Sequence, residues 1–168
     1  MARMGVVIGA AALALFVSAS ARAQDSTLSA QANQAFLAAN AQKPGTHVRP
    51  SGLQYRIIKN GFGKTPHAVD TVEVLYKGSL INGKVFDQTE PSLPAQFVVN
   101  RVIPGWTEAL EIMREGDEWE LVIPANLAYG ARGQPPVIPP SQTLVFDVQL
   151  LKVTPAPPKD ENSDQSSQ

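Results

Sequence analysis

Apolar and polar residues alternate over several short segments of the chain, the pattern expected of strands that bury one face. The clearest segment runs from Leu144 to Leu150, where every second residue is apolar while Asp147 and Gln149 lie on the opposite face. Weaker alternation marks other segments, residues 53–58, 71–76, 96–99 and 119–123. Asn82-Gly83 is a strong hairpin signal, and residues 84–87 return from it as a further strand. The pattern predicts about five strands, most of them in hairpins.

Helical spacing replaces this alternation after residue 103. Trp106, Ala109, Leu110 and Met113 lie at i, i+3, i+4 and i+7, and Gly116 follows as a stop signal. A sheet with one buried face, covered by a single amphipathic helix, is an α+β arrangement. We therefore predict an α+β fold.

A second short helix is predicted ahead of the sheet, over residues 26–43, which are rich in Ala, Gln and Leu and end at Pro44-Gly45. Its apolar stripe is weak and consists of Leu28, Ala35, Phe36 and Ala39. A helix of this length is marginal alone in water, so it is expected either to fray or to lean on another part of the chain.

A Gly- and Pro-rich loop, residues 127–143, leads into the last strand. Proline fixes φ and favours extended geometry in the residue before it, so the segment around Val137 and Ile138 has few conformations. A stiff apolar loop beside a sheet is suited to forming the wall of a pocket. The alternative interpretation is a long connection with no further role.

The ends of the chain differ in composition from the rest. Arg3, the apolar residues 6–17 and Ala21-Arg22-Ala23 have the pattern of a cleaved signal peptide over residues 1–23, and the apolar run is too short to span a bilayer. An uncleaved membrane anchor is the alternative. Residues 24–47 are then a helical extension, residues 48–153 the main domain, and residues 154–168 a polar tail predicted to be disordered.

Charge and composition exclude several classes of partner. Removing the leader leaves 12 Lys and Arg against 15 Asp and Glu, which predicts a mildly acidic exported protein with no basic surface for nucleic acid or for a membrane. There is no cysteine, and the two histidines, His47 and His67, lack the spacing of metal ligands. We expect neither a metal nor a cofactor.

No motif of a hydrolase, a metalloprotease or a nucleotide-binding protein is present. What remains is an aromatic set, namely Tyr76, Phe86, Trp106, Tyr129 and Phe146. Taken singly, such residues usually belong to the core, and Asp87 would by default cap a turn. Spacing alone therefore names no reaction.

Three long segments resemble the FKBP family of peptidyl-prolyl cis-trans isomerases. They read VEVLYKGSLINGKVFD (72–87), VIPGWTEALEIM (102–113) and LAYGARGQPPVIPPSQTLVFDVQLL (127–151), in the order and at about the spacing of that family. Residues 51–64 are similar to the exported bacterial branch that includes the macrophage infectivity potentiator proteins. The resemblance implies a twisted antiparallel sheet wrapped around one short helix, with a pocket between them.

The same resemblance assigns roles to residues of that pocket. Trp106 would form the floor under a proline ring, and Tyr129 and Ile138 would form the flap. The walls would be lined by Tyr76, Phe86, Val102, Ile103 and Phe146. The Ile103 N–H and the Tyr129 hydroxyl would donate to ligand carbonyl groups, and the Asp87 carboxylate would face the twisted bond. We thus expect Asp87, Tyr129 and Ile103 to serve catalysis and the others to bind substrate.

Two positions differ from many members of the family. Ala95 stands where a phenylalanine is common, in a loop about two residues shorter, and Gln134 stands where histidine is frequent. Both are expected at the pocket rim, where they affect substrate preference and the affinity of FKBP-class macrolide inhibitors. The N-terminal helix is also far shorter than the dimerising arm of the infectivity potentiators, which favours a monomer.

The resemblance implies an isomerase that acts on proline-containing polypeptides during the folding of exported proteins, in the periplasm of a Gram-negative cell. Two other interpretations stay open beside the isomerase. The same pocket could bind proline segments without catalysing their isomerisation, as a binding module or holdase chaperone, because a fold alone does not establish activity. A structural or adhesive surface protein is supported only by the polar tail.

Overall fold

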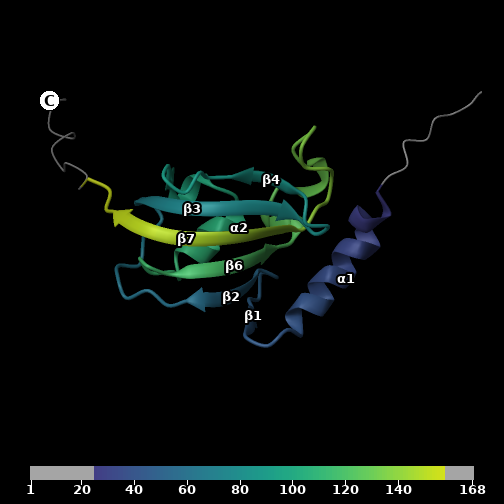
Figure 1. Cartoon of the computed structure of the whole chain (residues 1–168), viewed down its shortest axis with the longest axis horizontal. Helices are drawn as coiled ribbons and strands as arrows, with labels where there is room; N and C mark the ends of the chain where they lie inside the picture. The colour runs from purple at the N-terminus through teal and green to yellow at the C-terminus, as the bar shows by residue number, and fades with distance from the viewer. Residues whose placement is uncertain (1–24, 158–168) are drawn as a thin grey trace, which may run out of the picture.

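The computed structural model describes residues 25–157. The predicted leader and residues 158–168 of the predicted tail lie outside this range. Figure 1 shows one curved sheet, with helix α2 (Pro104–Leu110) behind it and helix α1 (Ala30–Ala41) across one end. The predicted α+β class, a twisted antiparallel sheet around one short helix with a helix ahead of it, is confirmed.

The sheet contains β1 (Thr46–Val48), β2 (Gln54–Lys59), β3 (Thr71–Leu80), β4 (Val85–Gln88), β5 (Ala95–Val98), β6 (Glu118–Ile123) and β7 (Leu144–Thr154). Their order is β1-β2-β6-β7-β3-β4, with β5 also paired to β3, and all pairings are antiparallel. β1 is the strand that the sequence does not predict. It lies at the sheet edge, where His47 and Val48 are exposed, so its three residues carry no apolar alternation.

The alternation predicted for the last strand is confirmed in β7, since Leu144, Phe146, Val148 and Leu150 are all buried. These side chains pack against those of the helix predicted after residue 103. The observed helix, α2, ends at Leu110, so Met113, the last residue of the predicted apolar stripe, is buried but lies outside the helix. The core therefore lies between the concave face of the sheet and α2.

Four 3-10 turns complete the described elements, η1 (Ser26–Leu28), η2 (Val99–Arg101), η3 (Ala125–Leu127) and η4 (Gly130–Arg132). The helix predicted over residues 26–43 is interrupted at Ser29, whose hydroxyl accepts a hydrogen bond from the Ala32 N–H at 3.1 Å. This is an N-cap interaction, and α1 begins there.

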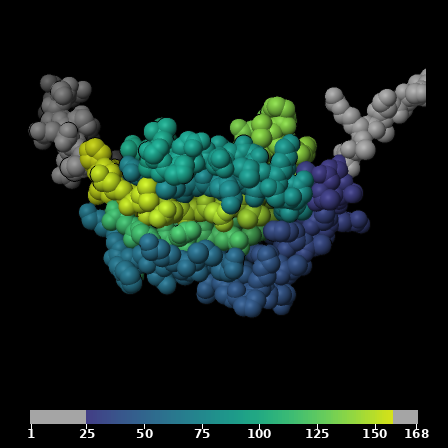
Figure 2. All heavy atoms as spheres, viewed as in Figure 1, coloured from purple at the N-terminus to yellow at the C-terminus, as the bar shows by residue number. Residues whose placement is uncertain are grey.

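The apolar stripe predicted for this helix is confirmed only in part. Leu28 and Phe36 are half-buried, but Ala35 and Ala39 are exposed, and the fully buried residues of α1 are Asn33 and Asn40. The Asn33 amide donates to the Gln142 side chain at 3.2 Å, and its oxygen accepts the Thr143 N–H at 2.7 Å. Figure 2 shows α1 lying directly against the rest of the molecule. The helix therefore docks through amide groups.

Backbone contacts cross both boundaries predicted for the main domain. β1 crosses the boundary predicted at residue 48 and pairs with β2, so the extension is part of the domain. At the other end, Thr154 pairs with Thr71, and the Ala156 N–H donates to Asp70 Oδ1 at 3.0 Å. The ordered chain thus continues past the boundary predicted at residue 153. Among residues 25–157 no helix is long and apolar enough to cross a membrane.

Candidate active site

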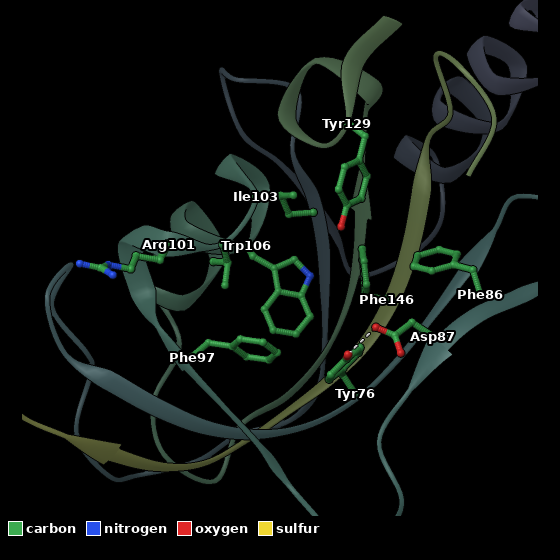
Figure 3. Close-up of a pocket in the computed structure, with 10 residues that line it drawn as sticks. Tyr76, Phe86, Asp87, Phe97, Arg101, Ile103, Trp106, Tyr129 and Phe146 are labelled. Carbon is green, nitrogen blue, oxygen red and sulfur yellow. Dashed lines mark hydrogen bonds between the residues drawn. The ribbon is translucent and has the colours of Figure 1, made fainter. Parts of the chain in front are cut away.

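A cavity of about 420 Å³ opens between α2 and the sheet (Figure 3). It is lined by Tyr76, Phe86, Asp87, Phe97, Arg101, Val102, Ile103, Trp106, Tyr129 and Phe146. These residues come from β3, β4, β5, η2, α2, β7 and the loop before η4. Residues far apart in the sequence are thus brought to one aromatic pocket.

Trp106 forms the floor of this cavity. Pro104 occupies the first turn of α2, where its missing N–H costs nothing, and Gly105 lets the helix approach β6. A Cβ at Gly105 would lie only 2.5 Å from Ile123 Cγ2. This close approach buries the indole to 4% exposure beneath the cavity.

Other rings stand edge-on around the indole. The Trp106 ring centroid lies 5.3 Å from that of Tyr76 and 5.3 Å from that of Phe146, with interplanar angles of 90° and 83°. Phe97 lies at 5.8 Å and 82°. Edge-to-face contacts of this kind are favourable between aromatic rings and fix their positions. The result is a rigid box of apolar walls.

The box also depends on a glycine in β3. A Cβ at Gly78 would lie 2.7 Å from Phe146 Cε1 and 2.7 Å from Phe86 Cζ. The absence of a side chain there allows both rings to meet edge-on, 5.6 Å apart, at one side of the cavity.

Asp87 supplies a carboxylate at the rim, and it accepts a hydrogen bond from the Tyr76 hydroxyl at 2.6 Å. Burial, followed by this hydrogen bond, raises the pKa of Tyr76. Burial and the negative charge of Asp87 likewise raise the pKa of Tyr129. Both phenols therefore stay protonated at neutral pH, and both can donate hydrogen bonds.

Several hydrogen-bond donors of the lining residues have no partner in the described part of the chain, among them the buried indole N–H of Trp106. The Ile103 carbonyl accepts from the Trp106 and Thr107 N–H groups at the start of α2, but no hydrogen bond from the Ile103 N–H is found. The Tyr129 hydroxyl, which points into the cavity in Figure 3, also has none among residues 25–157. These groups can bind carbonyl oxygens of a ligand.

The structure brings together eight of the predicted site residues, namely Tyr76, Phe86, Asp87, Val102, Ile103, Trp106, Tyr129 and Phe146. The exception is Ile138, which was predicted in the flap. It is 2% exposed, belongs to the buried core cluster, and is not among the residues that line the cavity.

Phe97 and Arg101 line the cavity but were not predicted. Ala95, predicted at the rim, instead pairs with Val74 in the sheet and is not part of the lining. Phe97 lies two residues later on the same face of β5 and supplies an aromatic ring to the lining. Gln134 is exposed in the loop and also lies outside the lining.

Among the described residues no group of three His, Cys, Asp or Glu side chains could hold a metal ion. The chemistry that the site offers is that of an aromatic cavity with hydrogen-bond donors, one carboxylate and one guanidinium among its lining residues.

Two family profiles match the chain. The profile described as FKBP-type peptidyl-prolyl cis-trans isomerase matches residues 63–151, and the one described as the domain amino terminal to FKBP-type peptidyl-prolyl isomerase matches residues 8–57. Together they cover both the sheet with its cavity and the segment that precedes it.

Curated relatives agree with these profiles. The chain is 54% identical over 120 residues to the outer membrane protein MIP of Legionella longbeachae, covering 71% of this chain and 52% of that protein. It is 51% identical over 119 residues to the FKBP-type 22 kDa peptidyl-prolyl cis-trans isomerase of Escherichia coli K12, covering 70% and 58%. The chain therefore spans about half the length of the curated relatives it matches.

Solved structures share the fold. A peptidyl-prolyl cis-trans isomerase of Pseudomonas syringae superposes with a TM-score of 0.71 at 40% identity, over 74% of this chain and 92% of that one. FkpA of Escherichia coli superposes with a TM-score of 0.71 at 45% identity, over 74% and 59%. With the isomerase profile matching more than half of the sequence on this fold, the chain belongs to the FKBP-type peptidyl-prolyl cis-trans isomerase family.

Proposed function

We propose that the chain accelerates rotation about X-Pro peptide bonds in polypeptide substrates. The observation that carries this proposal is the floor of the cavity, where Trp106 lies inside a box of edge-on aromatic rings. Such a box accepts a flat, apolar pyrrolidine ring, and the Ile103 N–H and Tyr129 hydroxyl at its rim are free to bind the adjoining carbonyls.

Rotation needs no bond to be made or broken. The barrier of about 18–20 kcal/mol arises because twisting the amide destroys its resonance. The twisted amide is less polar than the planar one, so transfer from water into an apolar cavity favours the twisted state over the ground state. Catalysis then follows from stronger binding of the transition state than of the substrate.

The polar residues would orient the substrate. Ile103 and Tyr129 would hold carbonyl groups on either side of the bond, and Asp87 would face the bond while keeping Tyr76 in place through their 2.6 Å hydrogen bond. Phe86, Val102 and Phe146 would contact the substrate as walls. In this assignment no side chain transfers a proton.

We further propose that the chain acts after export, in the periplasm. The predicted signal peptide supports this location, and one relative is named an outer membrane protein. Proline isomerisation takes tens of seconds without a catalyst and limits the folding of many chains, so an isomerase in this compartment has substrates. A monomer is proposed because α1 has 12 residues and its two buried asparagines contact its own domain.

The test is the cis-to-trans rate of a short X-Pro peptide with the purified full chain, with and without an FKBP-class macrolide. Acceleration that the macrolide abolishes is the expected result. A folded sample that binds the macrolide and does not accelerate rotation would instead identify a binding module or holdase. A folded sample that neither binds nor accelerates would overturn both functions.

A further inference from the structure

Arg101 is the only cation among the residues that line the cavity. Its side chain is exposed, and among residues 25–157 no carboxylate lies within ion-pair distance of it. Other arginines do have such partners, since Arg49 pairs with Glu108 at 3.0 Å and Arg56 with Glu120 at 3.1 Å. The pocket rim thus carries an unpaired positive charge in a chain of slightly negative net charge.

The backbone under this charge is fixed. Arg101 ends η2, and Val99 in the same turn is 0% exposed. The Val99 N–H donates to the Asp70 carbonyl at 3.0 Å, and the Val99 carbonyl accepts the Thr107 hydroxyl at 2.7 Å. The turn is therefore tied to the residue before β3 and to α2, so the backbone that carries Arg101 has a defined place relative to the indole of Trp106.

The second charged residue of the lining, Asp87, lies on the other side of the cavity. Figure 3 shows Asp87 and Arg101 at opposite sides, with Trp106 and Phe97 between them. The guanidinium of Arg101 points away from the indole, outward from the rim. A proline ring bound on Trp106 would therefore not contact the Arg101 guanidinium. The part of the substrate polypeptide that leaves the cavity on that side would contact it.

We propose that Arg101 gives the site a preference for polypeptides with an acidic residue a short distance from the proline. This inference rests on the isomerase activity proposed above. An extended chain advances about 3.3–3.6 Å per residue, so a carboxylate two or three residues from the proline reaches beyond a ring-sized cavity. On that side a substrate Glu would form an ion pair with Arg101, whereas a substrate Lys would be repelled by the guanidinium.

The size of the effect follows from the exposure of Arg101. Exposed ion pairs are weak, and the preference for Glu over Gln is expected to be about threefold in kcat/KM at low salt. Since a Debye length is only about 10 Å at 0.1 M salt, the preference should shrink as salt is added. A preference caused by the shape of the side chain would not depend on salt.

The experiment uses a peptide series with a fixed Leu-Pro core and Glu, Gln or Lys placed one to three residues away on either side. kcat/KM is measured for the full chain, for Arg101→Gln and Arg101→Glu, and for Arg114→Gln. Arg114 is also exposed but does not line the cavity, so its variant controls for the change in net charge. The ratio between Glu and Lys peptides is compared within each variant.

The wild-type chain and Arg114→Gln should favour Glu on one side of the proline. Arg101→Gln should remove the preference, and Arg101→Glu should reverse it. An equal rate for Glu, Gln and Lys peptides, or a preference that persists in Arg101→Gln, would overturn the role of Arg101 while leaving the isomerase in place. Failure of the wild-type chain to turn over even the Gln peptides would overturn the isomerase itself.

Discussion

The carboxylate of Asp87 and the hydroxyl of Tyr129 test whether the site orients its substrate or transfers protons. Asp87→Ala and Tyr129→Phe each remove a polar group at the rim. One hydrogen bond contributes about 0.5–1.5 kcal/mol, and about 1.4 kcal/mol corresponds to a tenfold change, so each variant should lower kcat/KM about three- to tenfold. The measurement is the isomerisation rate of an X-Pro peptide.

Glu90→Ala is the matched control, because Glu90 is an exposed carboxylate near β4 that does not line the cavity. It should leave the rate unchanged. General acid–base catalysis contributes about 10²–10⁴-fold, so a loss of that size in folded Asp87→Ala protein would mean that Asp87 exchanges protons with the substrate.

The two tryptophans allow packing to be separated from catalysis. Trp106 and Trp119 are each 4% exposed, but only Trp106 lines the cavity, while Trp119 stacks on Tyr55 at 4.5 Å. Truncation of a buried Trp to Ala costs about 3–5 kcal/mol, so both Trp→Phe variants should lose less than this, as measured by urea unfolding. Only Trp106→Phe should also lower kcat/KM. Equal loss of activity in both would show that general stability, and not the floor, limits the rate.

Most of the site could be predicted at the residue scale, because the resemblance carries whole motifs in register. The motifs did not identify Phe97, which lies two residues after Ala95 in β5 and lines the cavity. Ile138 lies in a loop that is folded back on itself by two backbone hydrogen bonds between Gln134 and Ile138, at 2.8 and 2.9 Å, and its side chain is buried. One feature of the sequence could have identified Arg101 as a lining residue, namely its position directly before Val102 and Ile103, which were both predicted in the pocket.

At the scale of the element, α1 is held by buried amide groups. Asn33 contacts Gln142 and Thr143, and at the other end of the helix Asn40 donates to the Gln54 side chain at 2.9 Å. Gln142 is itself buried and donates to the carbonyls of Leu28 and Pro140. The network therefore ties the helix to the end of the Pro-rich loop that carries Tyr129.

Asn33→Ala should destabilise the protein, because it leaves the buried Thr143 N–H without its acceptor. An unsatisfied buried group costs about 1–3 kcal/mol, which urea unfolding would detect. Gln34→Ala is the control, since Gln34 is the next residue of α1 and is exposed. A loss in Asn33→Ala no larger than that in Gln34→Ala would mean that α1 does not depend on this contact.

These contacts explain why elements were predicted unevenly. The strands and α2 bury apolar side chains at a regular period, so the sequence reveals them. Amide pairs such as Asn33 with Gln142 have no periodic pattern, so the buried face of α1 could not be read from the sequence. The same holds for β1, whose side chains are exposed while its backbone pairs with β2.

At the scale of the whole molecule, the strand order depends on pairings between distant parts of the chain. β2 pairs with β6, joining Gln54 to Val122, and β3 pairs with β7, joining Thr71 to Thr154. Alternation identifies strands and their buried faces but contains no information about partners. The strand order was therefore not predicted, and the resemblance implied only an antiparallel sheet wrapped around one helix.

Two carboxylates bind backbone N–H groups at the C-terminal end of β7. Asp70, which is 5% exposed, accepts the His67 N–H at 2.8 Å and the Ala156 N–H at 3.0 Å, holding the segment after β7. Glu115 accepts the Val153 N–H at 2.6 Å. An ionised carboxylate accepts these hydrogen bonds more strongly than a protonated one, so the stability of this end of the sheet depends on pH.

Backbone hydrogen bonds, from His67 and then Ala156, hold the pKa of Asp70 below its usual 3.8. The Val153 N–H likewise lowers the pKa of Glu115 from 4.5. Because the pKa of each carboxyl is lower in the folded state, the unfolded chain binds more protons in acid than the folded one. The stabilisation by these two carboxylates is therefore complete above their unfolded-state pKa values, and it is lost as the pH falls through the folded-state values. The urea concentration at the midpoint of unfolding should therefore decrease below about pH 4.5.

Asp70→Asn and Glu115→Gln should each make that decrease smaller, whereas Glu111→Gln, at an exposed carboxylate, should not. An unchanged pH profile in both of the first two variants would show that other groups control acid unfolding.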